Sequence, residues 1–155
     1  MTDYTITPDD LTSAEVLDLL RLHLEEMHRW SPACKVHAMP PERLREKDVS
    51  FFAVRDGETL AAVGALKALD ATRGELKSMR AAPAFRGKGA GRALLEHLIG
   101  EARTRGYTWL GLETGRPREF LPAVRLYESY GFAECEAFGD YVSDEFSLCM
   151  EAHLT

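Results

Sequence analysis

Residues 86–91 read Arg-Gly-Lys-Gly-Ala-Gly and separate a strand-like run from a strongly amphipathic helix. Glycine lets the backbone approach an anion closely and adopt positive φ angles, and a helix that follows offers free N–H groups and the positive end of its dipole. The stretch therefore predicts a loop that binds a pyrophosphate through main-chain amides. The residues expected to form this loop are Arg86, Gly87, Lys88, Gly89, Ala90, Gly91 and Arg92.

Two commoner phosphate-binding loops do not fit this stretch. A P-loop requires Ser or Thr after its lysine, but Lys88 is followed by Gly89. The dinucleotide-binding fingerprint requires a longer last interval between its glycines than this stretch has. A glycine-rich turn without any ligand is the alternative that the six residues leave open.

Two further segments extend the pattern. Residues 81–87 read Ala-Ala-Pro-Ala-Phe-Arg-Gly, and residues 123–132 read Ala-Val-Arg-Leu-Tyr-Glu-Ser-Tyr-Gly-Phe. Together with the loop they resemble the Val-x-Pro-x-x-Arg-Gly, Arg-x-x-Gly-x-Gly and Ala-x-x-Leu-Tyr-x-x-x-Gly-Phe segments of the GNAT superfamily, the acyl-CoA-dependent N-acetyltransferases. The order and spacing of the segments match the family, and the resemblance covers residues 75–132.

Length, composition and charge indicate one globular domain, residues 1–155. A chain of 155 residues buries about two thirds of its unfolded surface, and its 45% hydrophobic and 28% charged residues are ordinary values. The net charge of −6 argues against a general nucleic-acid or anionic-membrane surface. No signal or membrane-spanning pattern occurs, and the three cysteines form no Cys-x-x-Cys pair, so we expect a cytoplasmic protein with reduced thiols.

The hydrophobic pattern predicts strands that cluster first and then alternate with helices. Strands are expected at residues 2–7, 49–55, 59–69, 75–82, 107–113, 132–138 and 145–152, and helices at residues 12–28, 41–46, 89–105 and 122–130. This order indicates a mixed sheet flanked by helices. The resemblance implies the same α/β (α+β) fold, with a mostly antiparallel sheet of about six or seven strands and about four helices.

Acetyl transfer from acetyl-CoA to an amine is the activity that the resemblance implies. An alkyl amine has a pKa near 10 and must lose its proton before it attacks the thioester. Glu75 begins the strand that leads to the loop and Glu113 ends the next strand, so each is a candidate base or a solvated charge at a strand end. Tyr127 matches the family's tyrosine that protonates the leaving thiolate, or it is a core tyrosine of its helix.

The resemblance also assigns cofactor contacts to the strand before the loop. Main-chain groups near Met79 and Ala81 are expected to pair with the pantetheine arm, and an amide there is expected to polarise the thioester carbonyl. Phe120 departs from the family pattern, because many members carry a cofactor-contacting Asn at this place. A cofactor contact from that segment is therefore not implied.

Candidate acceptor-binding residues stand at a helix break and after Glu113. The break carries an aromatic residue and histidines that in this family lie over the acceptor side of the sheet, or it forms a loop packed around its tryptophan. Two arginines after Glu113 could bind an acidic group on the acceptor or solvate a loop. These candidates are His28, Trp30, His37, Arg116 and Arg118. No His or Cys cluster has the spacing of a metal site, so no metal is predicted.

We therefore expect an N-acetyltransferase that moves an acetyl group from acetyl-CoA to a primary amine of a small molecule, by direct attack in a ternary complex. None of the three cysteines falls in a matched segment, which argues against a covalent acyl carrier. A non-catalytic acyl-CoA-binding module and an acetyltransferase of protein or peptide amines are the open alternatives. The expected partners are acetyl-CoA and an amine, without nucleic acid or membrane, and a homodimer is left open.

Overall fold

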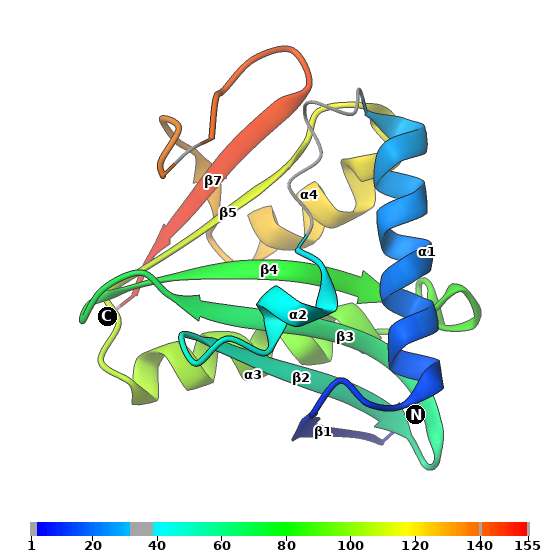
Figure 1. Ribbon diagram of the computed structural model, residues 1–155. Helices are drawn as coiled ribbons and strands as arrows, with labels where there is room; N and C mark the ends of the chain where they lie inside the picture. Colours follow the sequence, from blue (N-terminus) through cyan, green and yellow to red (C-terminus); the bar gives the residue numbers. More distant parts are fainter. Residues whose placement is uncertain (1–2, 32–38, 140, 155) are drawn as a thin grey trace.

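The structure is a computed structural model that describes residues 3–31, 39–139 and 141–154. Within these ranges seven strands form one sheet in the order β1-β2-β3-β4-β5-β7-β6, and four α-helices flank it (Figure 1). All neighbouring strands are antiparallel except β4 and β5, which are parallel. The predicted mixed, mostly antiparallel fold is confirmed. No helix in the described ranges is both long enough and apolar enough to cross a membrane.

The elements follow the predicted order. The strands are β1 (Tyr4–Pro8), β2 (Val49–Asp56), β3 (Thr59–Ala68), β4 (Arg73–Ala81), β5 (Trp109–Gly115), β6 (Ala133–Glu134) and β7 (Ser147–His153). The helices are α1 (Ala14–Trp30), α2 (Pro41–Leu44), α3 (Ala90–Thr104) and α4 (Leu121–Ser129), with short 3-10 turns η2 (Pro83–Phe85) and η3 (Arg118–Phe120).

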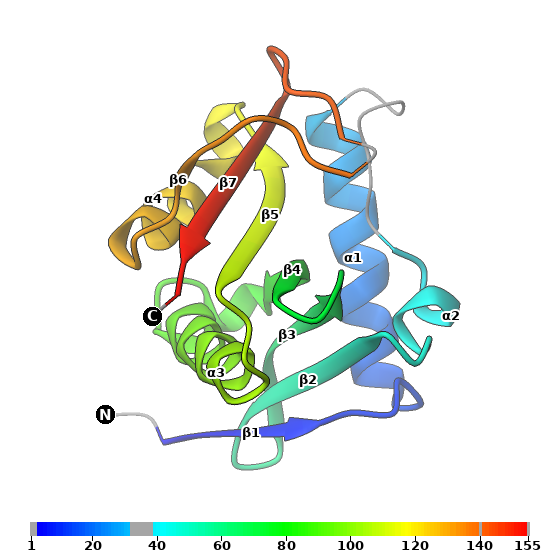
Figure 2. The same cartoon turned by 90° about the vertical axis from the view of Figure 1, so that its left-hand side faces the viewer.

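The sheet lies between helices on both faces. Figure 2 shows α3 on one side of β2, β3 and β4 and α1 on the other side. Successive residues of β2 alternate between the two faces: Phe51 and Ala53 join the cluster under α1, and Phe52 and Val54 join the cluster under α3. The central strand β3 is buried on both faces, so its sequence is almost continuously apolar.

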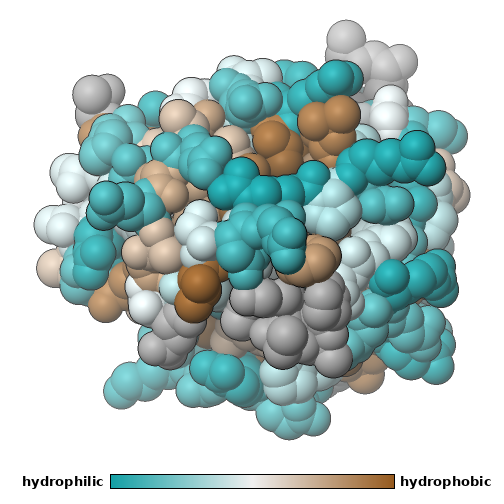
Figure 3. Space-filling view, turned by 90° about the horizontal axis from the view of Figure 1, so that it is seen from above, coloured by the Kyte–Doolittle hydropathy of each residue, from teal (hydrophilic) through white to brown (hydrophobic). Residues whose placement is uncertain are grey.

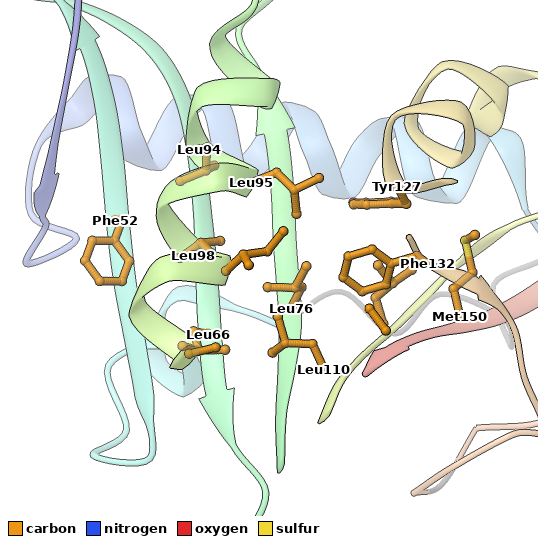
Figure 4. Packing of buried hydrophobic residues seen from close by; sticks show 14 of the residues in the cluster. Phe52, Leu66, Leu76, Leu94, Leu95, Leu98, Leu110, Tyr127, Phe132 and Met150 are labelled. Carbon is orange, nitrogen blue, oxygen red and sulfur yellow. The ribbon is translucent and has the colours of Figure 1, made fainter. Parts of the chain in front are cut away.

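The larger core cluster lies under α3 and α4. Leucines of α3 pack against apolar residues of β3, β4 and β5, and Tyr127 and Phe132 close the cluster on the α4 side (Figure 4). Its fully buried leucines include Leu66, Leu94, Leu95, Leu98 and Leu110. These residues anchor α3, so the start of this helix is held firmly at the end of β4.

The apolar face of α1 continues into polar residues. Ser13 caps the helix, since its hydroxyl accepts a hydrogen bond from the Val16 N–H at 3.3 Å. Val16, the first buried residue of α1, faces the sheet, but further along the same helix His23 and Glu26 are also buried. Buried polar groups need partners. The C-terminal half of α1 therefore places two polar side chains, His23 and Glu26, against the sheet.

The parallel strands β4 and β5 separate after a short ladder. Their last paired residues are Glu75 and Gly111, beyond which β4 runs on to Ala81 and β5 to Gly115 (Figures 1 and 2). The pairing of β4 with β3 also shifts register, and Ser78 has a φ of 55° at that point. This β-bulge re-aims the side chains that follow it. The result is a wedge between β4 and β5.

One strand prediction was wrong in extent. A strand was expected over residues 132–138, but β6 contains only Ala133 and Glu134. The Cys135 N–H still bonds to the Cys149 carbonyl at 2.9 Å, and the chain then leaves the ladder. Phe138 instead packs its ring edge-to-face on Trp109, with centroids 5.1 Å apart. Aromatic packing outside the ladder thus competes with the strand propensity of this segment.

Candidate active site

A cleft of about 920 Å³ opens where β4 and β5 separate. Its wall is built by the second half of α1, the end of β4, the loop before α3, the end of β5, and η3 with the start of α4. Figure 3 views the molecule from above, with hydrophobic groups standing between hydrophilic ones. The cleft thus extends from the wedge between β4 and β5 to α1 on one side and α4 on the other.

The loop between β4 and α3 has the backbone of an anion cradle. Gly87 and Gly89 have φ angles of 72° and 85°, and a Cβ at either position would meet nothing within 4 Å. Glycine is needed here for conformation and for close approach of a ligand. Gly89 caps α3 without a side-chain hydrogen bond, which leaves the first N–H groups of the helix available to a ligand. The predicted loop residues that line the cleft are Arg86, Gly87, Gly89, Gly91 and Arg92.

Two predicted loop residues lie outside the cleft wall. The Lys88 carbonyl accepts a hydrogen bond from the Tyr4 hydroxyl at 2.7 Å, which joins the loop to β1. Ala90 is completely buried beneath the first turn of α3. These residues shape the loop from behind, and only main-chain groups of Ala90 are suited to contact an anion.

The end of β4 brings the predicted pantetheine-binding residues to the wedge. Ala81 pairs with Ala62 of β3, and both Met79 and Ala81 line the cleft. A Cβ at Gly64 would lie 2.5 Å from the Met79 Sδ, so Gly64 is the residue that lets the bulged strand pack this closely. The edge of β4 beyond Glu75 faces the cleft, as the predicted main-chain pairing requires.

The two candidate bases have different surroundings. Glu75 is buried, and its Oε2 atom forms an ion pair with the Lys77 Nζ at 3.1 Å and accepts a hydrogen bond from the Tyr141 hydroxyl. Lys77 Nζ also donates to the Tyr141 hydroxyl at 2.6 Å. Glu113 lacks such an ion pair among the described residues. Its burial raises its pKa to about 7, against the opposing effects of a Ser147 hydrogen bond and the Lys77 charge. A carboxylate with that pKa is suited to accept a proton near neutrality.

Tyr127 lines the cleft from α4. Its ring packs edge-to-face on Phe132 with centroids 5.8 Å apart, and Figure 4 shows the two rings close together. Burial raises its pKa to about 12. The phenol therefore stays protonated at all physiological pH values and is a hydrogen-bond donor at the cleft surface.

Sequence reasoning missed a polar cluster between α1 and β4. Arg80 Nε donates to the His23 Nδ1 at 2.9 Å, and Arg80 Nη1 donates to the Glu26 Oε1 at 3.0 Å. Arg86 Nη2 donates to the same Glu26 oxygen at 2.8 Å. Burial and the Arg80 charge lower the pKa of His23 to about 3, so His23 is neutral. The missed signal was the position of His23 and Glu26 on the apolar side of α1.

Among the predicted acceptor-binding residues, Trp30 lies in the cleft wall. Its ring lies 5.3 Å from the Arg80 guanidinium carbon, and it meets Phe120 edge-to-face with centroids 5.5 Å apart. Phe120, the departure from the family pattern, thus makes this part of the wall apolar. His28 is exposed and outside the wall, and His37 lies outside the described residues.

The two predicted arginines after Glu113 do not reach the cleft wall. Arg116 Nη2 forms an ion pair with Glu134 Oε2 at 2.7 Å, and its Nε donates to the Ser147 carbonyl at 3.2 Å. It braces the turn after β5. Arg118 is exposed on η3. Within the described ranges no group of three or more His, Cys, Asp or Glu residues could hold a metal ion.

Comparisons with known proteins agree on one family. The model of the acetyltransferase (GNAT) family matches residues 16–132. The chain is 44% identical over 146 residues to the uncharacterized N-acetyltransferase YsnE of Bacillus subtilis (strain 168), covering 94% of this chain and 97% of that one. It is 36% identical over 137 residues to the IAA acetyltransferase of Azospirillum brasilense, covering 84% and 88%. A solved Klebsiella pneumoniae structure, whose name assigns it to the acyl-CoA N-acyltransferases, superposes with a TM-score of 0.78 at 30% identity and covers 98% of each chain.

Proposed function

The chain belongs to the acetyltransferase (GNAT) family, and from this premise we propose that it transfers an acetyl group from acetyl-CoA to a primary amine of a small molecule. Acetyl-CoA is the donor that the family generally uses. One observation carries the proposal: the glycine loop, the open edge of β4 and Glu113 all line the same cleft. An anion cradle, a channel for an extended arm and a base are the parts that this transfer needs.

Glu113 is the proposed base. With a pKa of about 7 it is partly ionised at neutral pH and accepts a proton from the acceptor ammonium group. The neutral amine then attacks the thioester carbonyl, a tetrahedral intermediate forms, and its oxyanion is stabilised by main-chain N–H groups near Met79. The intermediate loses a second proton to water as the C–S bond breaks.

Tyr127 is proposed to assist the leaving thiolate. A phenol whose pKa is about 12 is a weaker acid than a thiol, whose pKa is near 8.5, so complete proton transfer to the thiolate is unfavourable. A hydrogen bond from the hydroxyl stabilises the negative charge on sulfur, and the thiolate then takes its proton from solvent. The products are the acetylated amine and CoA, with no covalent enzyme intermediate.

The test is release of CoA from acetyl-CoA in the presence of a panel of primary amines, followed with a thiol reagent and confirmed by mass spectrometry of the acetylated product. We expect amine-dependent release and a product that is heavier by one acetyl group. Tight acetyl-CoA binding without product from any small amine or peptide would instead support a non-catalytic acyl-CoA-binding module. Action in the cytoplasm, without a metal, is part of the same proposal.

A further inference from the structure

Arg80 is a buried cation with unused hydrogen-bonding capacity in the cleft wall. Its side chain is only 9% exposed, and two of its three nitrogens bond to His23 and Glu26. The third, Nη2, is shielded from water and has no hydrogen-bond partner among the described residues. A buried charged donor without a partner is costly and is rare in native structures. The Arg80 side chain lines the cleft, so a ligand atom can supply the missing acceptor once the side chains that cover Nη2 move aside.

The cluster around Arg80 also carries unbalanced charge. Arg80 and Arg86 share the single carboxylate of Glu26, and His23 is neutral because burial lowers its pKa. One positive charge is therefore left in a region where the Glu26 and Arg80 side chains are both largely removed from solvent. The Nη2 group that lacks a partner is a charged N–H donor, and a carboxylate oxygen is a strong acceptor for such a donor.

The surroundings of Arg80 limit what kind of anion can bind. The Trp30 ring covers the guanidinium, and Phe120 packs on Trp30, so the wall beside the cation is aromatic. Such a wall suits a ligand with an apolar or planar body, and it does not suit a strongly hydrated inorganic anion. The anion is thus expected to be one end of an organic molecule.

Arg80 and the proposed base lie at different depths in the wedge. Arg80 follows the last paired residue of β4 by five positions, and Glu113 follows its partner on β5 by two. In regular strands these steps span roughly 16 and 7 Å, and the bulge at Ser78 shortens the first of them. A molecule that reaches both groups must hold its amine and its carboxylate several bonds apart. An α-amino acid, in which both groups share one carbon, is too short for this.

We propose that Arg80 binds a carboxylate of the acceptor, and that the acceptor is an amine whose carboxylate is separated from it by a spacer. This inference rests on the proposed function and names the substrate class for the same site. Arg80 is then a specificity-determining residue held in place by His23 and Glu26. Trp30 and Phe120 contact the spacer.

The experiment pairs substrates that differ only in the anion. Acetyl transfer is measured for ω-amino acids of increasing length, from glycine to 6-aminohexanoate, and for the carboxamide of each. We expect the longer carboxylates to be preferred over their amides by roughly 10- to 100-fold in kcat/KM, mainly through KM. Arg80→Met should remove this preference, because it should lower kcat/KM for the carboxylates far more than for the amides. Arg80→Lys keeps the charge, loses the planar donors, and should restore only part of the preference.

Separate measurements distinguish the failure of this inference from the failure of the proposed function. Acetyl-CoA affinity is measured by calorimetry for the wild type, Arg80→Met and Arg86→Met, with thermal melting as the check of folding. The carboxylate site would be overturned if the acid and the amide of each pair had equal kcat/KM. It would also be overturned if Arg80→Met lost as much acetyl-CoA affinity as Arg86→Met. If no amine is acetylated, the proposed function fails. The inference is then decided by the affinity of the CoA-loaded protein for 6-aminohexanoate, which should be lower in Arg80→Met than in the wild type.

Discussion

The glycine loop and the Arg80 cluster line the same cleft, but the chain builds them in different ways. The loop consists of consecutive residues 86–91 and offers main-chain N–H groups, whose direction depends on the φ angles of Gly87 and Gly89. The Arg80 cluster joins side chains that are 54 to 60 residues apart in sequence, on α1, β4 and the loop. A site made of backbone is local in sequence, whereas a site made of side chains depends on the whole fold.

This difference predicts different responses to mutation. In the loop, a change matters through the shape and charge it imposes on the backbone cradle. In the Arg80 cluster, and at Glu113 and Tyr127, a change matters through one functional group at a time. Substitutions in each region therefore test whether the loop and the Arg80 cluster act separately.

Gly89→Asp should abolish acetyl-CoA binding. A carboxylate at this position lies where a phosphate is expected, and the repulsion between two such charges at close range is about 4 kcal/mol, an affinity loss of about 1000-fold. Gly106→Asp is a matched control, since Gly106 has a φ of 83°, has nothing within 4 Å of an added Cβ and stands at the far end of α3. Calorimetric titration should show binding lost only in Gly89→Asp. Equal affinities of the two variants would remove the loop from the cofactor site.

Glu113→Gln should lower the rate with saturating acetyl-CoA by roughly 100- to 1000-fold. The wild-type rate should rise with pH along one ionisation near 7, as Glu113 loses its proton, and this limb should vanish in the variant. Glu75→Gln should keep the limb, because Glu75 is engaged by Lys77 and Tyr141. A limb that disappears in Glu75→Gln and persists in Glu113→Gln would reverse the assignment.

The same group predicts how stability depends on pH. The pKa of Glu113 is raised in the folded state above its usual value of 4.5, so the folded protein holds this proton more tightly than the unfolded chain. The contribution to stability is fully present below about pH 4.5 and declines as the pH rises through 7. The melting temperature of Glu113→Gln relative to wild type should therefore increase between pH 5 and pH 8. A constant difference would mean that burial does not perturb this carboxyl group.

Tyr127→Phe should reduce turnover by about tenfold and leave acetyl-CoA affinity unchanged, because one hydrogen bond to a developing thiolate is lost while the ring still packs on Phe132. Tyr107→Phe is the control, since Tyr107 belongs to the same core cluster but not to the cleft wall. Steady-state kinetics and thermal melting distinguish the two roles. A fall in melting temperature with an unchanged rate would identify Tyr127 as a packing residue.

Much of the fold could be predicted because it depends on local patterns. The apolar periodicity of α1 and α3 and the apolar run of β2 each appear within a few residues of sequence and recur in the structure. The expected strand over residues 132–138 failed at Glu134, since Phe138 packs on Trp109, which is distant in sequence. Tertiary contacts override local propensity most easily at the edge of a sheet, where one neighbour is missing.

The site divides along the same line. Gly87 and Gly89 could be found from sequence because the loop motif is contiguous. Arg80 could not, since its role depends on the β-bulge at Ser78 and on two α1 residues more than 50 positions away. Arg116 and Trp30 were both sequence candidates for acceptor binding, and only the fold separates them. One braces a turn and the other lines the cleft.

Glu26→Gln should produce the smallest change, a gain in acetyl-CoA affinity, and it tests the link between the loop and the Arg80 cluster. Glu26 bonds to Arg80 of the cluster and to Arg86 of the loop, and the Arg86 side chain is 50% exposed. Glu26 is buried, but water reaches the Arg86 end of the pair and screens it, so the pair contributes about 1 kcal/mol. If a bound pyrophosphate must draw Arg86 away from Glu26, removing the carboxylate should strengthen acetyl-CoA binding by about two- to fivefold. Asp18→Asn removes the same charge from an exposed part of α1 and is the control. Calorimetry in an Arg86→Met background decides the cause, because the gain in acetyl-CoA affinity should vanish there. A gain that persists would show that Glu26 acts through the electrostatic potential of the cleft. The loop and the Arg80 cluster would then be energetically independent.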